Sequence, residues 1–264
     1  MKFYLRYCCA MFFALCSFLL ATPLSAQAQT REAYVAQSED KSTLTFYYDA
    51  LRSTRTGTTW GIEETKKKGD DTFAVWAGTS DEPDRITTRV VFDASFRDFR
   101  PTTTARWFYY CFEIKQIEGL EFLNTSEVKD MSGMFNDCSG LTSLDLSHFN
   151  TQNVTDMIEE FKGCSALTTI KSNTAWECPI SVNMFAGCTK LKGAVAYDEN
   201  KTDATMANPE TGYFTAKPTT VESVRFGADG VQQIYTLQGK RVRGEWKHLP
   251  AGVYVVNGKK TVKP

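Results

Sequence analysis

The cysteines and histidines of this sequence are its first candidates for metal binding or nucleophilic catalysis. Cysteine occurs eight times and histidine twice. Four cysteines, Cys111, Cys138, Cys164 and Cys188, follow one another at intervals of 24 to 27 residues, whereas zinc sites use cysteines paired a few residues apart. We therefore expect one cysteine per repeating unit, stacked in a buried column where the thiol packs as a small apolar group. Disulfide bonds between neighbouring units are the alternative, if the chain is exported to an oxidising compartment.

The motifs that would use such residues for catalysis are missing from the sequence. His148 and His248 have no acidic or nucleophilic partner at a motif spacing, and the chain has no G-x-S-x-G, H-E-x-x-H, C-x-x-C or phosphate-binding glycine loop. The segment from Asp198 begins like a calcium loop, but Asp203 stands where that loop requires glycine. The sequence therefore predicts a protein that is not an enzyme and that holds neither a cofactor nor a metal ion.

A repeating unit of about 26 residues must position the cysteines. In each unit a Phe precedes the Cys by three residues, and apolar residues follow the Cys at intervals of three. A fixed period of this length is typical of stacked supersecondary units, each of which buries its apolar residues against its neighbours. The expected structural repeat positions are Phe108, Cys111, Phe135, Cys138, Leu141, Leu144, Phe161, Cys164, Leu167, Phe185, Cys188 and Leu191.

Each unit divides into two halves by the spacing of its apolar residues. Leu141, Leu144 and Leu146 end in an alternating pattern, which predicts a strand. Between Val154 and Cys164 the apolar residues have helical spacing, which predicts a helix capped by Asn153. The expected fold class is therefore α+β, with a short leucine-rich-repeat-like solenoid that contains one strand and one helix per repeat.

The first 28 residues have the features of a secretory signal peptide. Lys2 and Arg6 precede an apolar run from Tyr7 to Leu20, and small residues follow at Ala26-Gln27-Ala28. We expect removal of residues 1–28 and export of a mature chain without a transmembrane segment, since no later stretch reaches the roughly 20 apolar residues that span a membrane. The net charge of −1 argues against binding to nucleic acid or to an anionic membrane surface.

The remainder of the chain divides into four regions by composition. Residues 29–106 are rich in β-branched and aromatic residues, which predicts a β-rich unit that covers the open end of the first repeat. The repeats occupy residues 107–216, and a Lys-Pro-Thr-Thr stretch predicts a linker at residues 217–221. Residues 222–264 predict a small all-β module, with Asn257-Gly258 as a two-residue hairpin turn.

The repeat motif resembles that of a known family. One unit reads Phe149-Asn150-Thr151-x-Asn153-Val154-Thr155-Asp156-Met157, followed by Phe161-x-Gly163-Cys164-Ser165-x-Leu167-Thr168. This motif resembles the 26-residue repeat of the BspA-like leucine-rich-repeat surface proteins of bacteria, and the similarity covers residues from about 107 to 214. The resemblance implies a surface-exposed adhesion or host-interaction protein with no catalytic residues. Two positions depart from the pattern: Phe149 replaces the usual Asn, and Glu160 replaces a Met.

The tail has a second resemblance. It reads Ile234-Tyr235-x-Leu237-x-Gly239-Lys240-x-Val242, then Leu249-Pro250-Ala251-Gly252-Val253-Tyr254-Val255-Val256. This pattern is similar to the C-terminal sorting domain of type IX secretion cargo in Bacteroidota. The resemblance implies that export machinery recognises the tail, and that the protein reaches the cell surface or the extracellular space.

We expect the solvent-facing side of the repeat strands to bind a protein or glycan partner, because solenoids bind on a repetitive face. The alternative for these polar side chains is that they only solvate an exposed sheet. The candidate binding residues are Lys115, Gln116, Glu118, Thr142, Ser143, Asp145, Thr168, Thr169 and Lys171.

The size of this face limits its affinity. Four strands about 4.8 Å apart form a sheet only about 14 Å wide. Burial on that sheet alone is well below the roughly 800 Å² per partner of a standard interface. We therefore expect weak binding unless other surfaces or several copies contribute. The alternative function is a secreted scaffold whose solenoid self-assembles, which requires an open strand edge at the end of the stack.

Overall fold

The structure is a computed structural model of the 264-residue chain, and it describes residues 30–217, 234–236, 241–242, 249, 251–256 and 259–263. The predictions for the signal peptide, for His248 and for the turn at Asn257-Gly258 lie outside the described residues. Strands are the main elements of the described part, and its helices are short 3-10 turns. These are η1 (Arg52–Thr54), η2 (Ala94–Asp98), η3 (Leu120–Phe122) and η4 (Ala204–Met206).

The N-terminal part of the chain forms a five-stranded sheet with the order β3-β1-β2-β6-β7. β1 pairs antiparallel with β2 and β3, whereas β2, β6 and β7 run parallel to one another. β7 is the strand of the first repeat, and it pairs parallel with β6, with Val90 opposite Ile117. β6 therefore lies in the same series of parallel strands. The bounds are β1 (Glu32–Gln37), β2 (Thr43–Asp49), β3 (Thr58–Gly61), β6 (Arg89–Phe92) and β7 (Gln116–Glu118).

Side chains cover the outer edge of β3. Arg52 donates to the carbonyl oxygen of Thr59, at 3.3 Å, and pairs with Glu64 at 2.9 Å. Glu64 in turn accepts a hydrogen bond from the backbone N–H of Gly61, at 2.6 Å. The edge therefore offers fewer free backbone groups to another strand. β4 (Thr65–Lys68) and β5 (Asp71–Ala74) form a separate antiparallel pair.

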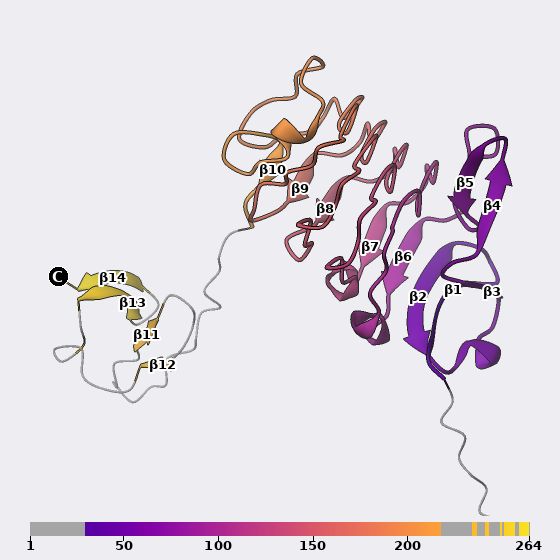
Figure 1. Cartoon of the computed structure of the whole chain (residues 1–264), viewed down its shortest axis with the longest axis horizontal. Helices are drawn as coiled ribbons and strands as arrows, with labels where there is room; N and C mark the ends of the chain where they lie inside the picture. The colour runs from indigo at the N-terminus through magenta and orange to yellow at the C-terminus, as the bar shows by residue number, and fades with distance from the viewer. Residues whose placement is uncertain are drawn as a thin grey trace, which may run out of the picture.

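A second, three-stranded parallel sheet has the order β10-β9-β8 and lies in the repeats. β8 (Ser143–Asp145) and β9 (Thr169–Lys171) fall in the expected strand halves of their units, and β10 (Phe214–Thr215) is the last strand. Leu144 lies opposite Ile170, and Ile170 opposite Phe214, so the inward apolar positions align. Figure 1 shows these units following one another in a row.

The predicted strand-plus-helix solenoid is wrong, because turns occupy the place of each expected helix in the described residues. Part of the backbone bonds to the next unit: the N–H of Phe135 donates to the carbonyl of Glu160, at 2.9 Å. Other N–H groups close tight turns, such as that of Cys138 to the carbonyl of Phe135, at 3.1 Å. Gly133 and Asp137, four residues apart, have φ of 58° and 57°. A right-handed α-helix cannot contain such left-handed residues.

The apolar spacing of i and i+3 therefore reflects successive turns rather than a helix. The turns still direct Val154 and Met157 into the core, which is why the pattern resembles an amphipathic helix. Asn153 does not cap a helix; its Nδ2 donates to the carbonyl of Ser126 in the preceding unit, at 2.7 Å. The described chain is thus β-rich, with several small sheets and short turns.

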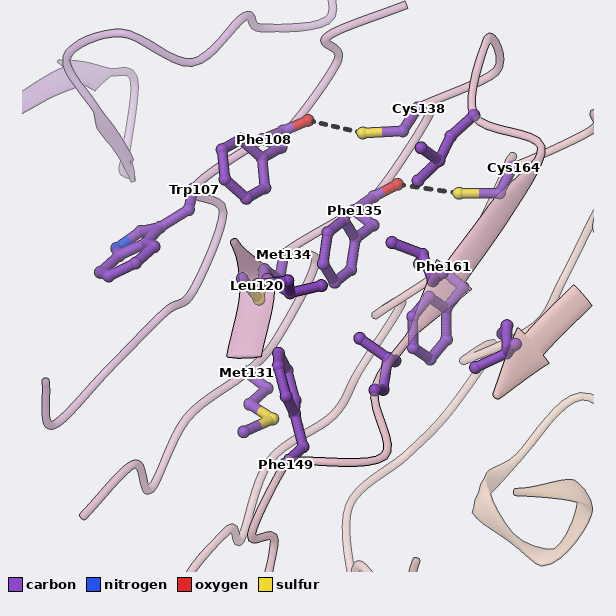
Figure 2. Close-up of a cluster of buried hydrophobic side chains, with 14 of the residues drawn as sticks. Trp107, Phe108, Leu120, Met131, Met134, Phe135, Cys138, Phe149, Phe161 and Cys164 are labelled. Atoms are coloured by element: carbon purple, nitrogen blue, oxygen red, sulfur yellow. Dashed lines mark hydrogen bonds between the residues drawn. The ribbon is translucent and has the colours of Figure 1, made fainter. Parts of the chain in front are cut away.

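Phenylalanines form one of the columns inside the stack. The rings of Phe108, Phe135, Phe161 and Phe185 are fully buried, and their centroids are 5.7, 5.7 and 5.5 Å apart in succession. Figure 2 shows the first three rings in a row. Stacked aromatic pairs at these distances contribute stability beyond the apolar area that they bury. The column therefore holds successive units together.

The cysteines form a second column beside the rings. The thiol of Cys164 donates to the carbonyl of Phe135, at 3.0 Å, and that of Cys188 to the carbonyl of Phe161, also at 3.0 Å (Figure 2 shows the bond from Cys164). The five cysteines of the described residues are free, so the disulfide alternative does not hold there. Burial raises the pKa of Cys164 well above 9.0. Such buried thiols are inert rather than nucleophilic.

One charged residue interrupts the buried columns. Glu160 stands where the neighbouring units have Met134 and Met184, and its side chain is fully buried. Neither of its carboxyl oxygens has a hydrogen-bond partner among the described residues. Burial, together with the negative charges of Asp130 and Asp156, raises the pKa of Glu160 well above 4.5. The core therefore favours the neutral acid at this position.

The tail contains a separate four-stranded sheet with the order β12-β11-β13-β14. Its pairs are antiparallel, and Val256 of β13 lies opposite Lys259 of β14, which leaves two residues for the connection between them. This register fits the predicted hairpin. The bounds are β11 (Ile234–Thr236), β12 (Arg241–Val242), β13 (Gly252–Val256) and β14 (Lys259–Lys263).

Candidate ligand-binding site

The series of parallel strands is interrupted between β7 and β8. These strands belong to different sheets and are not paired with each other. Ile117 and Leu144, at the centres of the two strands, are 27 residues apart, whereas Leu120 and Leu146 just after the strands are 26 apart. The first unit therefore has one additional residue between its strand and the turn that follows.

Gly119 lies in this lengthened segment and lets the chain turn away from the sheet. Its φ of 69° is in the left-handed region. A Cβ atom there would lie 2.1 Å from the carbonyl oxygen of Phe92, so both the conformation and the close approach require glycine. The chain then enters η3 directly, and β7 is left without a partner strand on the side of β8.

A cavity of about 340 Å³ lies at this interruption. Part of its lining is apolar, with Leu120 and Leu144 buried and Ile117 partly buried. Its remaining lining residues are Glu121, Ser143, Asp145, His148 and Lys217, all exposed or partly exposed. An apolar lining with a few convergent polar groups is typical of a ligand site, and this volume lies near the lower end of the range for small-molecule sites.

An ion pair between Asp145 and Lys217 fixes the polar side of the cavity. The Nζ of Lys217 lies 3.0 Å from Oδ2 of Asp145, and the hydroxyl of Ser147 donates to Oδ1 at 2.6 Å. Burial alone would raise the pKa of Asp145, but the hydrogen bonds from Ser147 and Lys217 outweigh it and hold that pKa below 3.8. The site therefore presents an ionised carboxylate at neutral pH, paired with Lys217.

The structure divides the predicted binding face into two parts. Ser143 lies opposite Thr169, and Asp145 opposite Lys171, so β8 and β9 present their polar side chains together. Thr168 donates to the carbonyl of Thr142, at 3.0 Å. The residues of β7 and its start form the other part: Lys115 and Gln116 are exposed, and Glu118 binds Arg89 through two hydrogen bonds of 2.8 and 2.6 Å.

Sequence reasoning missed three polar residues of the cavity. His148 has no partner motif, Glu121 follows the predicted strand, and Lys217 was assigned to a linker. The signal that could have located the cavity is the change of spacing from 27 to 26 residues between units. That change falls directly after β7, where the pairing of the strands is interrupted.

A larger hollow of about 710 Å³ lies elsewhere, between the loops at residues 151–155 and 175–179. Glu177 is the one ionisable carboxylate in its lining, next to Cys178. We consider the smaller cavity the better candidate because it combines an apolar lining with an ion pair and a histidine, and because it lies on the face that the sequence predicts for binding.

Within the described residues, no group of three His, Cys, Asp or Glu side chains is arranged to hold a metal ion. Across the same residues, no helix has the length and apolar character needed to cross a membrane.

Residues 102–208 match a family described as "Mycoplasma protein of unknown function, DUF285". The matched segment includes β7, β8 and β9, and every residue of the cavity lining except Lys217. Comparisons with curated proteins and with solved structures found no match.

Proposed function

We propose that this chain is an exported bacterial surface protein that binds a protein or glycan partner on its strand face, without catalysing a reaction. The observation that supports this most directly is the cavity between β7 and β8. Its ion pair of Asp145 and Lys217 and its apolar side offer complementary contacts to a partner group of modest size. The polar side chains of β8 and β9 extend the contact surface beside it.

The alternative of a self-assembling scaffold has less support. Such a scaffold needs an open strand edge at an end of the stack. Arg52 and Glu64 cover part of the edge of β3 at one end. At the other end the edge strand, β10, is only two residues long, and so short an edge offers few backbone groups to another strand. Both arrangements disfavour the addition of a second copy edge to edge.

A blocking substitution tests the strand face. Ser143→Trp places a large side chain at the cavity from an exposed position. Ser80→Trp is the matched control, because Ser80 is also exposed but lies outside the lining of this cavity and of the larger hollow. The labelled mature chain and both variants would be applied to a glycan array and to a panel of extracellular matrix proteins. We expect Ser143→Trp to weaken binding roughly tenfold or more and Ser80→Trp to leave it unchanged; equal binding by all three would refute the assignment.

We also propose that the tail directs the chain to the cell surface. The support is the similarity of the tail to type IX sorting domains, together with its compact antiparallel sheet. Deletion of residues 222–264 should retain the mature protein in the periplasm, measured by surface labelling of intact cells. Normal display of the truncated protein would leave the tail without a sorting role, and would not affect the binding proposal.

A further inference from the structure

The strand β8 has an open edge on the side of β7. Its other edge pairs with β9, where Leu144 lies opposite Ile170. β7 and β8 belong to different sheets, and the described part of the chain holds no backbone hydrogen bond between these two strands. Figure 1 shows β8 between β7 and β9. The open edge therefore lies within the row of units rather than at its end.

Alternate residues of β8 direct their backbone groups to opposite sides. The N–H of Leu146, just after the strand, donates to the carbonyl of Lys171 in β9, at 2.8 Å. Because the backbone groups of successive strand residues point to alternate neighbours, those of Leu144 face β9 as well. The N–H and C=O groups of Ser143 and Asp145 therefore face β7. These four groups have no hydrogen-bond partner among the described residues.

The first two units separate where these strands begin. Just before the strands, the N–H of Gly140 donates to the carbonyl of Phe112, at 2.8 Å. From there the units no longer pair along β7 and β8, and the cavity of about 340 Å³ lies between them. Between the next two units the N–H of Thr168 donates to the carbonyl of Thr142, at 2.9 Å, and β8 and β9 then pair along their whole length. The unpaired groups of β8 therefore border a cavity instead of a neighbouring strand.

The side chains of the cavity add an apolar surface and a negative charge to this edge. Leu144, at the centre of β8, is buried and forms part of the apolar lining. The charge of Asp145 is compensated by Lys217 at 3.0 Å. Glu121, which is exposed, forms no ion pair within the described residues. The cavity is thus complementary to a partner that brings an apolar side chain and a cationic group together.

We propose that the open edge of β8 binds an extended segment of a partner protein, which adds to β8 as a strand. Unpaired backbone groups along a strand edge are a template for another strand, and strand addition is a general mode of peptide recognition. Alternate side chains of the segment face the apolar lining, so it carries apolar residues at alternate positions and a lysine or arginine near Glu121. β8 is three residues long, which keeps the pairing short and the affinity weak. This inference rests on the proposed binding at the strand face and narrows the partner to a protein segment.

The test uses the mature chain and synthetic peptides. The probes are three acetylated heptapeptides with a lysine at each end, in which threonine alternates with valine, leucine or phenylalanine. Binding would be measured by calorimetry and by NMR titration, and we expect at least one peptide to bind. The best peptide is then N-methylated on one alternate set of backbone amides or on the other. Methylation of at least one set should weaken binding roughly tenfold or more, because it removes the donors that face β8.

Two variants of the chain test the same edge from the other side. Ser143→Pro removes the N–H that faces the cavity, and a strand edge tolerates proline where its N–H is unpaired. Ser143→Ala is the matched control, because it shortens the side chain and keeps the N–H. We expect the proline variant to bind the best peptide roughly tenfold more weakly and the alanine variant to bind it like the parent, with circular dichroism to establish that both are folded.

Three results would each overturn the proposal: no binding by any of the three peptides, equal binding by both methylated forms and the unmodified peptide, or equal binding by folded Ser143→Pro and Ser143→Ala. The methylated peptides decide the question where the proline variant does not fold. If Ser143→Trp loses a partner found on the arrays while no peptide binds, the strand face remains the binding site and strand addition alone is refuted.

Discussion

The thiol of Cys138 donates a hydrogen bond to the backbone carbonyl of Phe108, with 3.1 Å between sulfur and oxygen (Figure 2). The two residues belong to successive units, and both are fully buried. The bond therefore satisfies a carbonyl that water cannot reach. Cysteine at this position is both a packing group and a donor, whereas the sequence argument treated it as a packing group alone.

Substitution of Cys138 should distinguish these two roles. Cys138→Ala leaves the Phe108 carbonyl without a donor and creates a small void, so we expect a loss of roughly 1–3 kcal/mol in the free energy of unfolding. Cys138→Ser keeps a donor in nearly the same place and should cost only about 1 kcal/mol. Urea denaturation of both variants measures the difference. A serine variant less stable than the alanine variant would show that the hydrogen bond contributes little.

Replacement of Glu160 by methionine should stabilise the protein at neutral pH. Among the described residues the buried carboxyl has no hydrogen-bond partner, and Met134 and Met184 show that methionine fits the equivalent position. Because the pKa of Glu160 is higher in the folded state, the folded protein binds more protons than the unfolded chain as the pH rises above about 4.5. The contribution of Glu160 to the free energy of unfolding therefore falls as the pH rises above about 4.5.

We expect Glu160→Met to gain roughly 1–3 kcal/mol at pH 7 and to show a smaller decline of stability as the pH rises above about 4.5. Glu160→Gln is the matched control. It removes the titration but keeps an unpaired polar group, so the decline should diminish with a smaller gain. An unchanged pH dependence in both variants would mean that Glu160 has a normal pKa and is not buried as described.

Removal of the side chains that cover β3 should promote self-association. In the double variant Arg52→Ala, Glu64→Ala, the carbonyl of Thr59 and the N–H of Gly61 lose their partners and become available to another strand. Light scattering after size-exclusion chromatography should detect concentration-dependent oligomers. Lys68→Ala, Asp81→Ala removes another ion pair, of 2.9 Å, and should remain as monodisperse as the parent. Identical behaviour of the two double variants would contradict the edge argument.

Deletion of residues 107–133 should destabilise more than the deleted unit. Trp107 and Phe108 lie 5.4 and 5.7 Å from the ring of Phe46 in the N-terminal sheet, so the deletion removes contacts on both sides of the junction. We expect the melting temperature to fall by about 10 °C or more. Deletion of residues 222–264, whose described residues form a separate core, should leave the melting temperature of the remainder nearly unchanged. A parent-like melting temperature in the first variant would show that the units fold independently.

The sequence located the strands of the repeats but not the backbone between them. β8 lies where the alternating leucines predict a strand, and β9 lies at the equivalent place of the next unit, because one side of each strand must be buried whatever the remainder of the unit does. The helix prediction was wrong because turns closed over three residues repeat the i, i+3 pattern of a helix. Gly163 and Gly187, at equivalent positions, argue against a helix there, since glycine at a fixed place in a repeat indicates a left-handed residue.

The cavity could not be predicted from the polar residues of the face alone. Ser143 and Asp145 were identified from the strand pattern, but Lys217 reaches the site from a segment 72 residues later in the chain. Lys217 lies beside Asp145 because β10, just before it, pairs with β9. The additional residue near Gly119 was visible in the sequence, yet its effect on strand pairing depends on how closely the backbone approaches Phe92.

The short pairing of β10 has a mechanical consequence. This strand is two residues long and pairs with β9, and the described stack ends at Lys217, directly after it. When the chain is stretched between residue 30 and Lys217, the two-residue pairing of β10 and the ion pair with Asp145 resist at one end, and the six-residue pairing of β1 with β2 resists at the other. The last unit therefore detaches first. Because each unit contacts mainly its neighbours, such a load would peel the units away one after another. The protein would extend in steps under tension, and the N-terminal sheet would be the last part to rupture.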